Sequence, residues 1–298
     1  MKPAPFIYHR PRAVDEALAV LAAHGGEAKP LAGGQSLIPA MNFRLARPAV
    51  LVDLNRITEL SGIRGDPDGL HIGAMTRQRA VERDPTVARD APLLAEAMPF
   101  IAHPQIRNRG TIGGSLAHAD PAAELPAVML ALDAKLQARG SGGARWMPAG
   151  EFYTGLFETA LAPGELLVDI AIPLPAARSG SAFAEVARRH GDYALAGVAV
   201  VVTVDDAGRC REARIALLSV GDGPVLARNA AKAITGESPT PQAIREAAEA
   251  AAAKDIDPPG DIHASPAYRR QLVSVLVRRA LERAFRVATS ALGHGDQR

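Results

Sequence analysis

The spacing of apolar residues along the first third of the chain predicts a helix followed by strands. Apolar residues recur at helical spacing within residues 13–24, and a glycine pair follows them as a helix stop. Short apolar runs at 29–32 and 50–54 are strand candidates, and the second is rich in β-branched residues. A glycine-containing loop separates these two strands. The pattern predicts an α/β unit at the start of the chain.

The middle of the chain alternates further short elements with turns rich in glycine and proline. We expect a strand at 70–74, a helix from an N-cap at Thr76 to about Arg83, a helix at 91–102 that Pro104 ends, an apolar element at 124–134 and a hairpin-like turn at 138–146.

The pattern changes in the second half of the chain. Residues 173–181 collect two prolines, a glycine and serines, which indicates a domain boundary. Beyond it, strands near 194–204 and 212–220 flank an Asp-Ala-Gly turn, and helices are expected at 225–235, 241–254 and 266–291, the last ending before Gly293. Strands followed by helices favour an α+β C-terminal domain.

Composition excludes several classes of protein. A length of 298 residues suggests two domains, or one large domain with a smaller companion. The 34 basic and 32 acidic residues nearly balance, which argues against partners recognised by charge, such as nucleic acid or a membrane surface. The sequence has no apolar run long enough for a transmembrane helix and no secretory pattern at its start.

The single cysteine, Cys210, excludes a disulfide framework and makes a reducing cytoplasm the expected compartment. It also excludes an iron–sulfur cluster on this chain, because such a cluster normally takes four cysteine ligands. The eight histidines show no paired metal-ligand spacing, so we expect no metal site.

Two segments share a glycine pair followed by serine: AGGQS at 32–36 and TIGGS at 111–115. A glycine pair is often only a tight turn. Here, however, glycines would let the backbone approach a ligand, and successive N–H groups could converge on an anion. Two such loops offer enough donors to surround a diphosphate. The sequence lacks the GxGxxG, P-loop and GxSxG patterns of other nucleotide and hydrolase sites.

Several motifs along nearly the whole chain resemble one family. They are AGGQSLIP at 32–39, RLARPAVLVDLNRI at 44–57, IRNRGTIGGSLAHADPAAELPAV at 106–128, EFYTG at 151–155, ELLVDIAIP at 165–173, ARRHGDYALAGVAV at 187–200 and SPAYRRQLVSVLVRRAL at 265–281. The chain resembles the FAD-binding medium subunits of molybdenum hydroxylases, above all those of aerobic carbon monoxide dehydrogenase. The FAD domain of xanthine dehydrogenase is a more distant likeness.

The resemblance implies an α+β fold. A two-subdomain FAD-binding domain of the vanillyl-alcohol oxidase (PCMH) type would occupy residues 1–176, with subdomains of about 1–56 and 57–176. A small α+β domain would follow at 177–298.

The resemblance also implies partner subunits. A large subunit would carry the molybdopterin cofactor and oxidise the substrate, and a small subunit would carry two 2Fe–2S clusters. Electrons would reach FAD on this chain and then an external acceptor, in a dimer of heterotrimers. A free-standing FAD-dependent oxidoreductase and an FAD-binding assembly or scaffold protein remain alternatives. The sequence leaves open both the substrate and whether the acceptor is a quinone, NAD or oxygen.

The resemblance further assigns cofactor contacts to residues that match the family's motifs. These are Leu31, Ala32, Gly33, Gly34, Gln35, Ser36, Leu37, Ile101, Ala102, Thr111, Ile112, Gly113, Gly114, Ser115, Asp120, Glu124, Leu161 and Tyr193. The glycine segments would hold the pyrophosphate, the two carboxylates would face sugar hydroxyls, and the tyrosine would lie beside the isoalloxazine. Other interpretations stay open: core packing for the leucines, a helix-start role for the carboxylates and an ordinary strand position for the tyrosine.

Charged residues near the second glycine segment have no single interpretation. Arg107 and Arg109 could offset phosphate charge, lie in solvent or face an iron–sulfur subunit. We expect no catalytic acid or base on this chain, His103 and His118 included, because the electron-carrying chemistry belongs to the cofactor.

Overall fold

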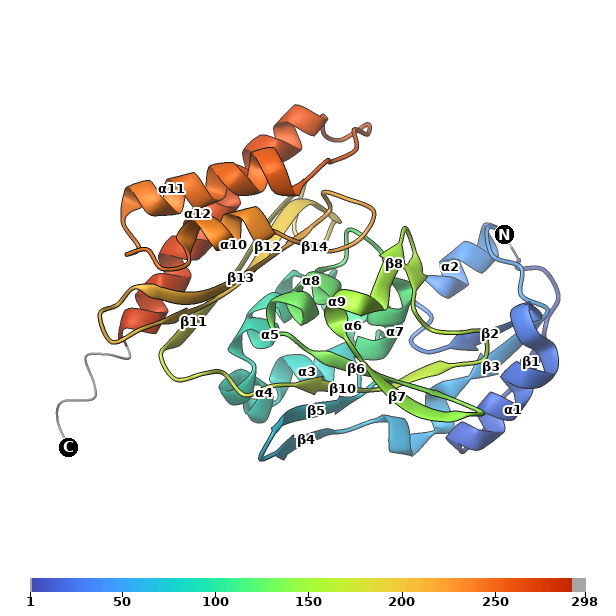
Figure 1. Cartoon of the computed structure of the whole chain (residues 1–298). Coiled ribbons are helices and arrows are strands. Elements are labelled where there is room, and N and C mark those ends of the chain that lie inside the picture. Colours follow the sequence, from blue (N-terminus) through green and yellow to red (C-terminus); the bar gives the residue numbers. More distant parts are fainter. Residues whose placement is uncertain (1, 291–298) are drawn as a thin grey trace.

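A computed structural model describes residues 2–290 of the chain. The expected end of the last helix at residue 291, Gly293 and the rest of the expected C-terminal domain up to residue 298 lie outside the described residues. The chain is α+β, and its three larger sheets follow one another along the sequence (Figure 1).

The first sheet is parallel, with strand order β1-β3-β2. Its strands are β1 (Ile7–His9), β2 (Ala28–Leu31) and β3 (Val50–Asp53), and all four residues of central β3 are buried. Helix α1 (Val14–His24) packs Val14, Leu18 and Leu21 into the core that it shares with these strands. The predicted helical spacing therefore places one apolar face of α1 against the sheet.

The second sheet is antiparallel, with strand order β4-β5-β10-β6-β7. Its strands are β4 (Ile63–Asp66), β5 (Gly69–Gly73), β6 (Lys135–Gly140), β7 (Gly143–Pro148) and β10 (Leu166–Ile172). The turn expected within 138–146 joins β6 and β7. The helices around this sheet are α3 (Gln78–Arg83), α4 (Pro85–Asp90), α5 (Pro92–Ala97), α6 (Pro104–Arg107), α7 (Ile112–His118), α8 (Glu124–Ala131) and α9 (Ala149–Phe152).

Helix α8 lies between the second and third sheets, and all eight of its residues are buried. The third sheet has strand order β11-β12-β13-β14 and consists of β11 (Ser179–Ala187), β12 (Ala194–Val204), β13 (Cys210–Leu218) and β14 (Val225–Leu226). Buried residues of this sheet, among them Phe183 and Leu218, join the core that surrounds α8. The two halves of the chain therefore share apolar packing through α8.

Three helices cover the other face of the third sheet (Figure 1): α10 (Arg228–Ile234), α11 (Pro241–Ala250) and α12 (Pro266–Ser290). Helix α12 lies directly on β11, since a Cβ atom at Gly180 would stand 2.0 Å from the carbonyl oxygen of Ala284. The small elements are α2 (Leu37–Asn42), β8 (Tyr153–Gly155) and β9 (Glu158–Thr159), with 3₁₀ turns at Gly25–Glu27, Leu54–Arg56, Thr58–Leu60 and Met98–Phe100 and a π turn at Ala251–Asp255.

Local expectations were wrong at two places near the second glycine segment. Arg77, not Thr76, is the N-cap of α3; the Thr76 hydroxyl is buried and donates to the carbonyl of Gly62 at 3.0 Å. The helix expected at 91–102 stops at Ala97 and gives way to one 3₁₀ turn. Pro104 then begins α6 instead of ending a helix, because proline suits the first helical turn.

Candidate functional site

The two glycine segments lie against each other, although the sequence separates them widely. A Cβ atom at Gly33 would stand 2.5 Å from the carbonyl oxygen of Arg109 and 2.8 Å from Cα of Gly110. A Cβ atom at Gly114 would stand 3.2 Å from Cβ of Ala32. The missing side chains therefore allow close packing of one segment on the other, and the two form one continuous surface.

The first segment presents unused hydrogen-bond donors on this surface. Across residues 2–290, no protein acceptor is found for the backbone N–H groups of Gly33, Gly34, Gln35 and Ser36. The backbone of Gly34 is left-handed (φ +76°), and the Ser36 hydroxyl makes no capping bond to α2. Consecutive N–H groups around a left-handed residue form a concavity suited to an anion. The segment fits a phosphate group.

The second segment does not offer the same donors, which corrects the expectation from its sequence. Thr111 is the N-cap of α7 and accepts from Gly114 N–H at 3.0 Å. The N–H groups of Ile112, Gly113 and Ser115 donate to the carbonyls of Thr76, Ala74 and Thr111, respectively. The N–H groups of residues 112–115 are thus satisfied within the protein, and the half-buried Ser115 hydroxyl is the donor left to face a ligand.

A polar network behind the surface fixes both segments. Asn55 donates through Nδ2 to the carbonyl of Ala32 at 2.9 Å, and Arg77 bonds both Asn55 Oδ1 and the carbonyl of Arg109. Asp53 accepts from Asn55 N–H at 2.9 Å and from the Tyr8 hydroxyl. Burial alone would raise the pKa of Asp53, but hydrogen bonds from Tyr8 and Asn55 outweigh it and hold this pKa below its usual value.

Sequence reasoning missed Asn55 and Arg77. The signal for Asn55 was present, because Asp-Leu-Asn follows directly at the end of a parallel strand, where α/β sheets place polar side chains next to ligands.

Arg107 does not face phosphate, solvent or a partner subunit. Its side chain is buried (4% exposed) and forms a two-pronged ion pair with Glu82, Nε–Oε2 at 2.9 Å and Nη2–Oε1 at 3.0 Å. Its remaining nitrogen donates to the carbonyl of Ile101 at 2.8 Å and more weakly to that of Ala102. The hydrogen bond from Arg107 lowers the pKa of Glu82. Arg107 therefore holds Ile101 and the left-handed Ala102 (φ +44°) in place, while Arg109 remains exposed.

Carboxyl groups and a tyrosine gather where the second and third sheets meet. Glu124 begins α8 and is 7% exposed; burial, and next the charge of Asp120, raises its pKa to about 7. Burial, and next the charge of Glu124, raises the pKa of Glu185 on β11 to about 8. Sequence reasoning missed Glu185, whose Oε2 is buried with no partner among the described residues.

Tyr193 stands just before β12 rather than inside a strand, so the ordinary-strand interpretation does not hold. The residue is 69% exposed, yet burial around its hydroxyl, and next the charges of Asp120 and Glu124, raises its pKa. The Tyr193 hydroxyl therefore senses the charges of Asp120, which precedes α8, and of Glu124, which begins it.

The leucines of the expected site are half-buried. Leu31 ends β2, Leu37 begins α2, and Leu161 packs against the core around α8. Packing is thus observed for Leu161.

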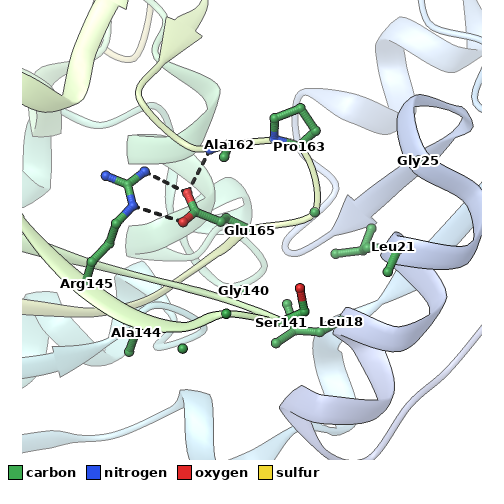
Figure 2. Close-up of a pocket in the computed structure, with 14 residues that line it drawn as sticks. Leu18, Leu21, Gly25, Gly140, Ser141, Ala144, Arg145, Ala162, Pro163 and Glu165 are labelled. Atoms are coloured by element: carbon green, nitrogen blue, oxygen red, sulfur yellow. Dashed lines mark hydrogen bonds and ion pairs between the residues drawn. The ribbon is translucent and has the colours of Figure 1, made fainter.

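A separate cavity lies away from these residues. Figure 2 shows it between α1, the β6–β7 turn and residues 162–165. The cavity has a volume of about 560 Å³. Its wall carries the ion pair between Arg145 and Glu165, whose nitrogen and oxygen atoms lie 2.7 Å apart. Its lining includes neither glycine segment. Within residues 2–290, the side chains form no cluster that could hold a metal ion, and no helix is both long and apolar enough to cross a membrane.

Comparison with known proteins gives two family matches. Residues 4–175 match the FAD binding domain in molybdopterin dehydrogenase, and residues 181–284 match the CO dehydrogenase flavoprotein C-terminal domain. Together these matches cover most of the chain.

Individual relatives match over nearly their whole length. The chain is 45% identical over 285 residues to the 6-hydroxypseudooxynicotine dehydrogenase complex subunit alpha of Paenarthrobacter nicotinovorans, covering 96% of each chain. It is 43% identical to the carbon monoxide dehydrogenase medium chain of Afipia carboxidovorans, covering 95% of this chain and 98% of the relative.

A solved structure shares the fold. Carbon monoxide dehydrogenase from Hydrogenophaga pseudoflava, in a form lacking the Mo-pyranopterin moiety of the molybdenum cofactor, superimposes with a TM-score of 0.94 at 41% identity. The superposition covers 96% of this chain and 99% of that one.

Proposed function

The chain belongs to the family of FAD-binding subunits of molybdopterin-dependent dehydrogenases, and from this premise we propose that it is the electron-transfer subunit of a heterotrimeric molybdenum hydroxylase. The matches confirm the family, the α+β fold and FAD as the cofactor that the sequence implied. The division into domains at residue 176 stays a prediction, and so do the individual cofactor contacts.

The unpartnered N–H groups of residues 33–36 carry the proposal for this chain. A diphosphate brings concentrated negative charge, and hydrogen bonds from backbone N–H groups to such oxygens are stronger than bonds between neutral groups. We assign the pyrophosphate of FAD to these donors and to the hydroxyls of Ser36 and Ser115. The second segment then acts mainly as the wall on which the first rests.

The flavin end of the cofactor is assigned to the seam between the second and third sheets. Ile101 and Ala102 would lie along the flavin and Tyr193 beside it. Asp120 and Glu124 would lie near the sugar hydroxyls of the cofactor. An aromatic ring there would stack on one flavin face or shield it. Bound FAD supplies the capacity to take up electrons and pass them on, and this chain's residues supply its binding and orientation.

The partners follow from the family and from the single cysteine. Relatives are named as medium chains or as subunits of dehydrogenase complexes. Cys210 alone cannot bind an iron–sulfur cluster, so we assign the 2Fe–2S clusters to a small subunit and the molybdopterin cofactor to a large one. A dimer of heterotrimers in the cytoplasm completes the proposal.

The test compares the chain alone with the chain assembled with both partners. Each preparation is loaded with FAD and mixed anaerobically with carbon monoxide, a nicotine-type heterocycle, a purine or an aldehyde in turn. The proposal predicts that the flavin visible absorbance is bleached only in the assembled complex, and only with the substrate of the large subunit.

Two results would contradict it. Bleaching of the isolated chain by one of these compounds would indicate a free-standing oxidoreductase. An assembled complex that oxidises substrate with an artificial acceptor while its flavin stays oxidised would indicate a scaffold.

A further inference from the structure

Ser219 connects three parts of the molecule through an unfavourable backbone conformation. It follows β13, and its φ of +65° is left-handed, which non-glycine residues rarely adopt. Its N–H donates to the carbonyl of Pro121 at 2.8 Å, and its hydroxyl donates to the carbonyl of Ala194 at 2.5 Å. Such strained residues persist only where their surroundings fix them, and they cluster at functional sites.

Arg269 on α12 also bonds the backbone at Ser219. Its side chain is buried (4% exposed), and Nη1 donates to the carbonyl of Ser219 at 2.9 Å and to that of Leu195. Its Nη2 bonds Asp261. One guanidinium therefore ties the end of β13 to the start of β12.

The start of β12 is where Tyr193 stands. The tyrosine precedes Ala194 directly, and its mostly exposed ring has little packing of its own to fix it. The turn before it rests on the second sheet's side, since a Cβ atom at the left-handed Gly191 would lie 2.4 Å from the ring of His103. Pro121, which Ser219 bonds, follows Asp120 in sequence. The Ser219 hydrogen bonds therefore set the Tyr193 turn against the segment that carries Asp120.

We infer that Ser219 and Arg269 are positioning residues that hold Tyr193 over the flavin. The inference rests on the proposed function, in which this chain holds FAD with Tyr193 beside the isoalloxazine. Neither residue would touch the cofactor; each acts through the backbone at residues 194–195.

The experiment uses the full-length chain loaded with FAD and measures flavin fluorescence and visible circular dichroism, which report on stacking rather than on folding. Ser219→Ala removes one hydrogen bond. Arg269→Lys keeps a charge for Asp261 but loses the planar fork, in which Nη1 bonds the two carbonyls while Nη2 bonds Asp261. Tyr193→Leu sets the signal for a flavin without its aromatic neighbour, and Ser61→Ala, at an exposed serine, is the matched control.

We expect Ser219→Ala and Arg269→Lys to retain FAD, to raise flavin fluorescence toward that of Tyr193→Leu and to shift the visible dichroism in the same direction. In the double variant with Tyr193→Leu, Ser219→Ala should add nothing further.

Wild-type signals in Ser219→Ala, alongside altered ones in Tyr193→Leu, would overturn the inference and leave the proposed function intact. Unchanged signals in Tyr193→Leu with FAD bound would also overturn it. A wild-type chain that takes up no FAD would instead fail the proposed function itself.

Discussion

Replacing Arg107 with methionine tests whether a buried charge holds the backbone at Ile101 and Ala102 in place. The guanidinium makes four hydrogen bonds, two to Glu82 and one to each of the two carbonyls. Methionine preserves much of the apolar volume but none of these bonds. The backbone at Ala102 is left-handed and would lose the group that holds it.

The expected cost follows from these contacts. Removing one partner of a buried ion pair costs about 3–5 kcal/mol, because the other charge stays buried. Glu82 would retain Arg79, whose Nη1 lies 2.8 Å from its Oε2, so the lower end of that range applies. For a domain of this size, about 3 kcal/mol lowers the melting temperature by roughly 6–12 °C.

Thermal and urea unfolding of Arg107→Met would measure this loss, and FAD titration would measure its effect on the site. Arg89→Met is the control, because the ion pair between Arg89 and Asp90 is exposed on the arginine side, and solvent screening leaves such surface pairs with little effect on stability. A double-mutant cycle with Glu82→Gln should give a coupling of at least about 1 kcal/mol. If Arg107→Met were no less stable than Arg89→Met, the buried ion pair would not be what holds the backbone at Ile101 and Ala102.

Three further predictions address other parts of the chain. Gly33→Ala would place a methyl group against the Arg109 carbonyl and should cost about 1–3 kcal/mol and weaken FAD binding, whereas Gly26→Ala, with open space around it, should do neither. Because the pKa of Glu185 is raised from 4.5 to about 8, its carboxyl group stays protonated in the native state at pH values where it is ionised in the unfolded chain. The free energy of unfolding of the FAD-free chain should therefore fall as the pH rises from 4.5 to about 8, by at most about 1.4 kcal/mol per pH unit. Urea titrations at several pH values should show a smaller fall in Glu185→Gln. The same dependence of unfolding free energy on pH in the variant and the wild type would contradict the assignment. Burial raises the pKa of Cys210 to about 11, so iodoacetamide at neutral pH should label it only in denaturant, and rapid labelling of the native chain would refute this.

The sequence alone was sufficient to predict helices and strands where local patterns and packing agree. The helical spacing before Gly25 predicted α1, and the long apolar run before Asp205 predicted β12, because both elements bury the face or faces that their patterns mark. The two glycine segments were also identified from sequence, and the structure brings them together.

Long-range contacts decided the features that the sequence did not predict. Thr76 carries a good N-cap side chain, but its hydroxyl bonds Gly62, fourteen residues away, so Arg77 takes the cap position. The N–H groups of Ile112 and Gly113 donate to the carbonyls of Thr76 and Ala74, far away in sequence, which no local motif reveals. The sequence left Arg107 open between phosphate, solvent and a partner subunit, because its burial depends on Glu82, a residue on another helix.

The most direct test of the central claim is calorimetric titration of the flavin-free chain with FAD and, separately, with FMN. FMN has the isoalloxazine and a single phosphate but lacks the diphosphate that we assign to residues 33–36. The account predicts one FAD bound per chain and FMN binding at least tenfold weaker, a difference of about 1.4 kcal/mol or more. FMN binding as tight as that of FAD would contradict the assignment of the first glycine segment to the pyrophosphate.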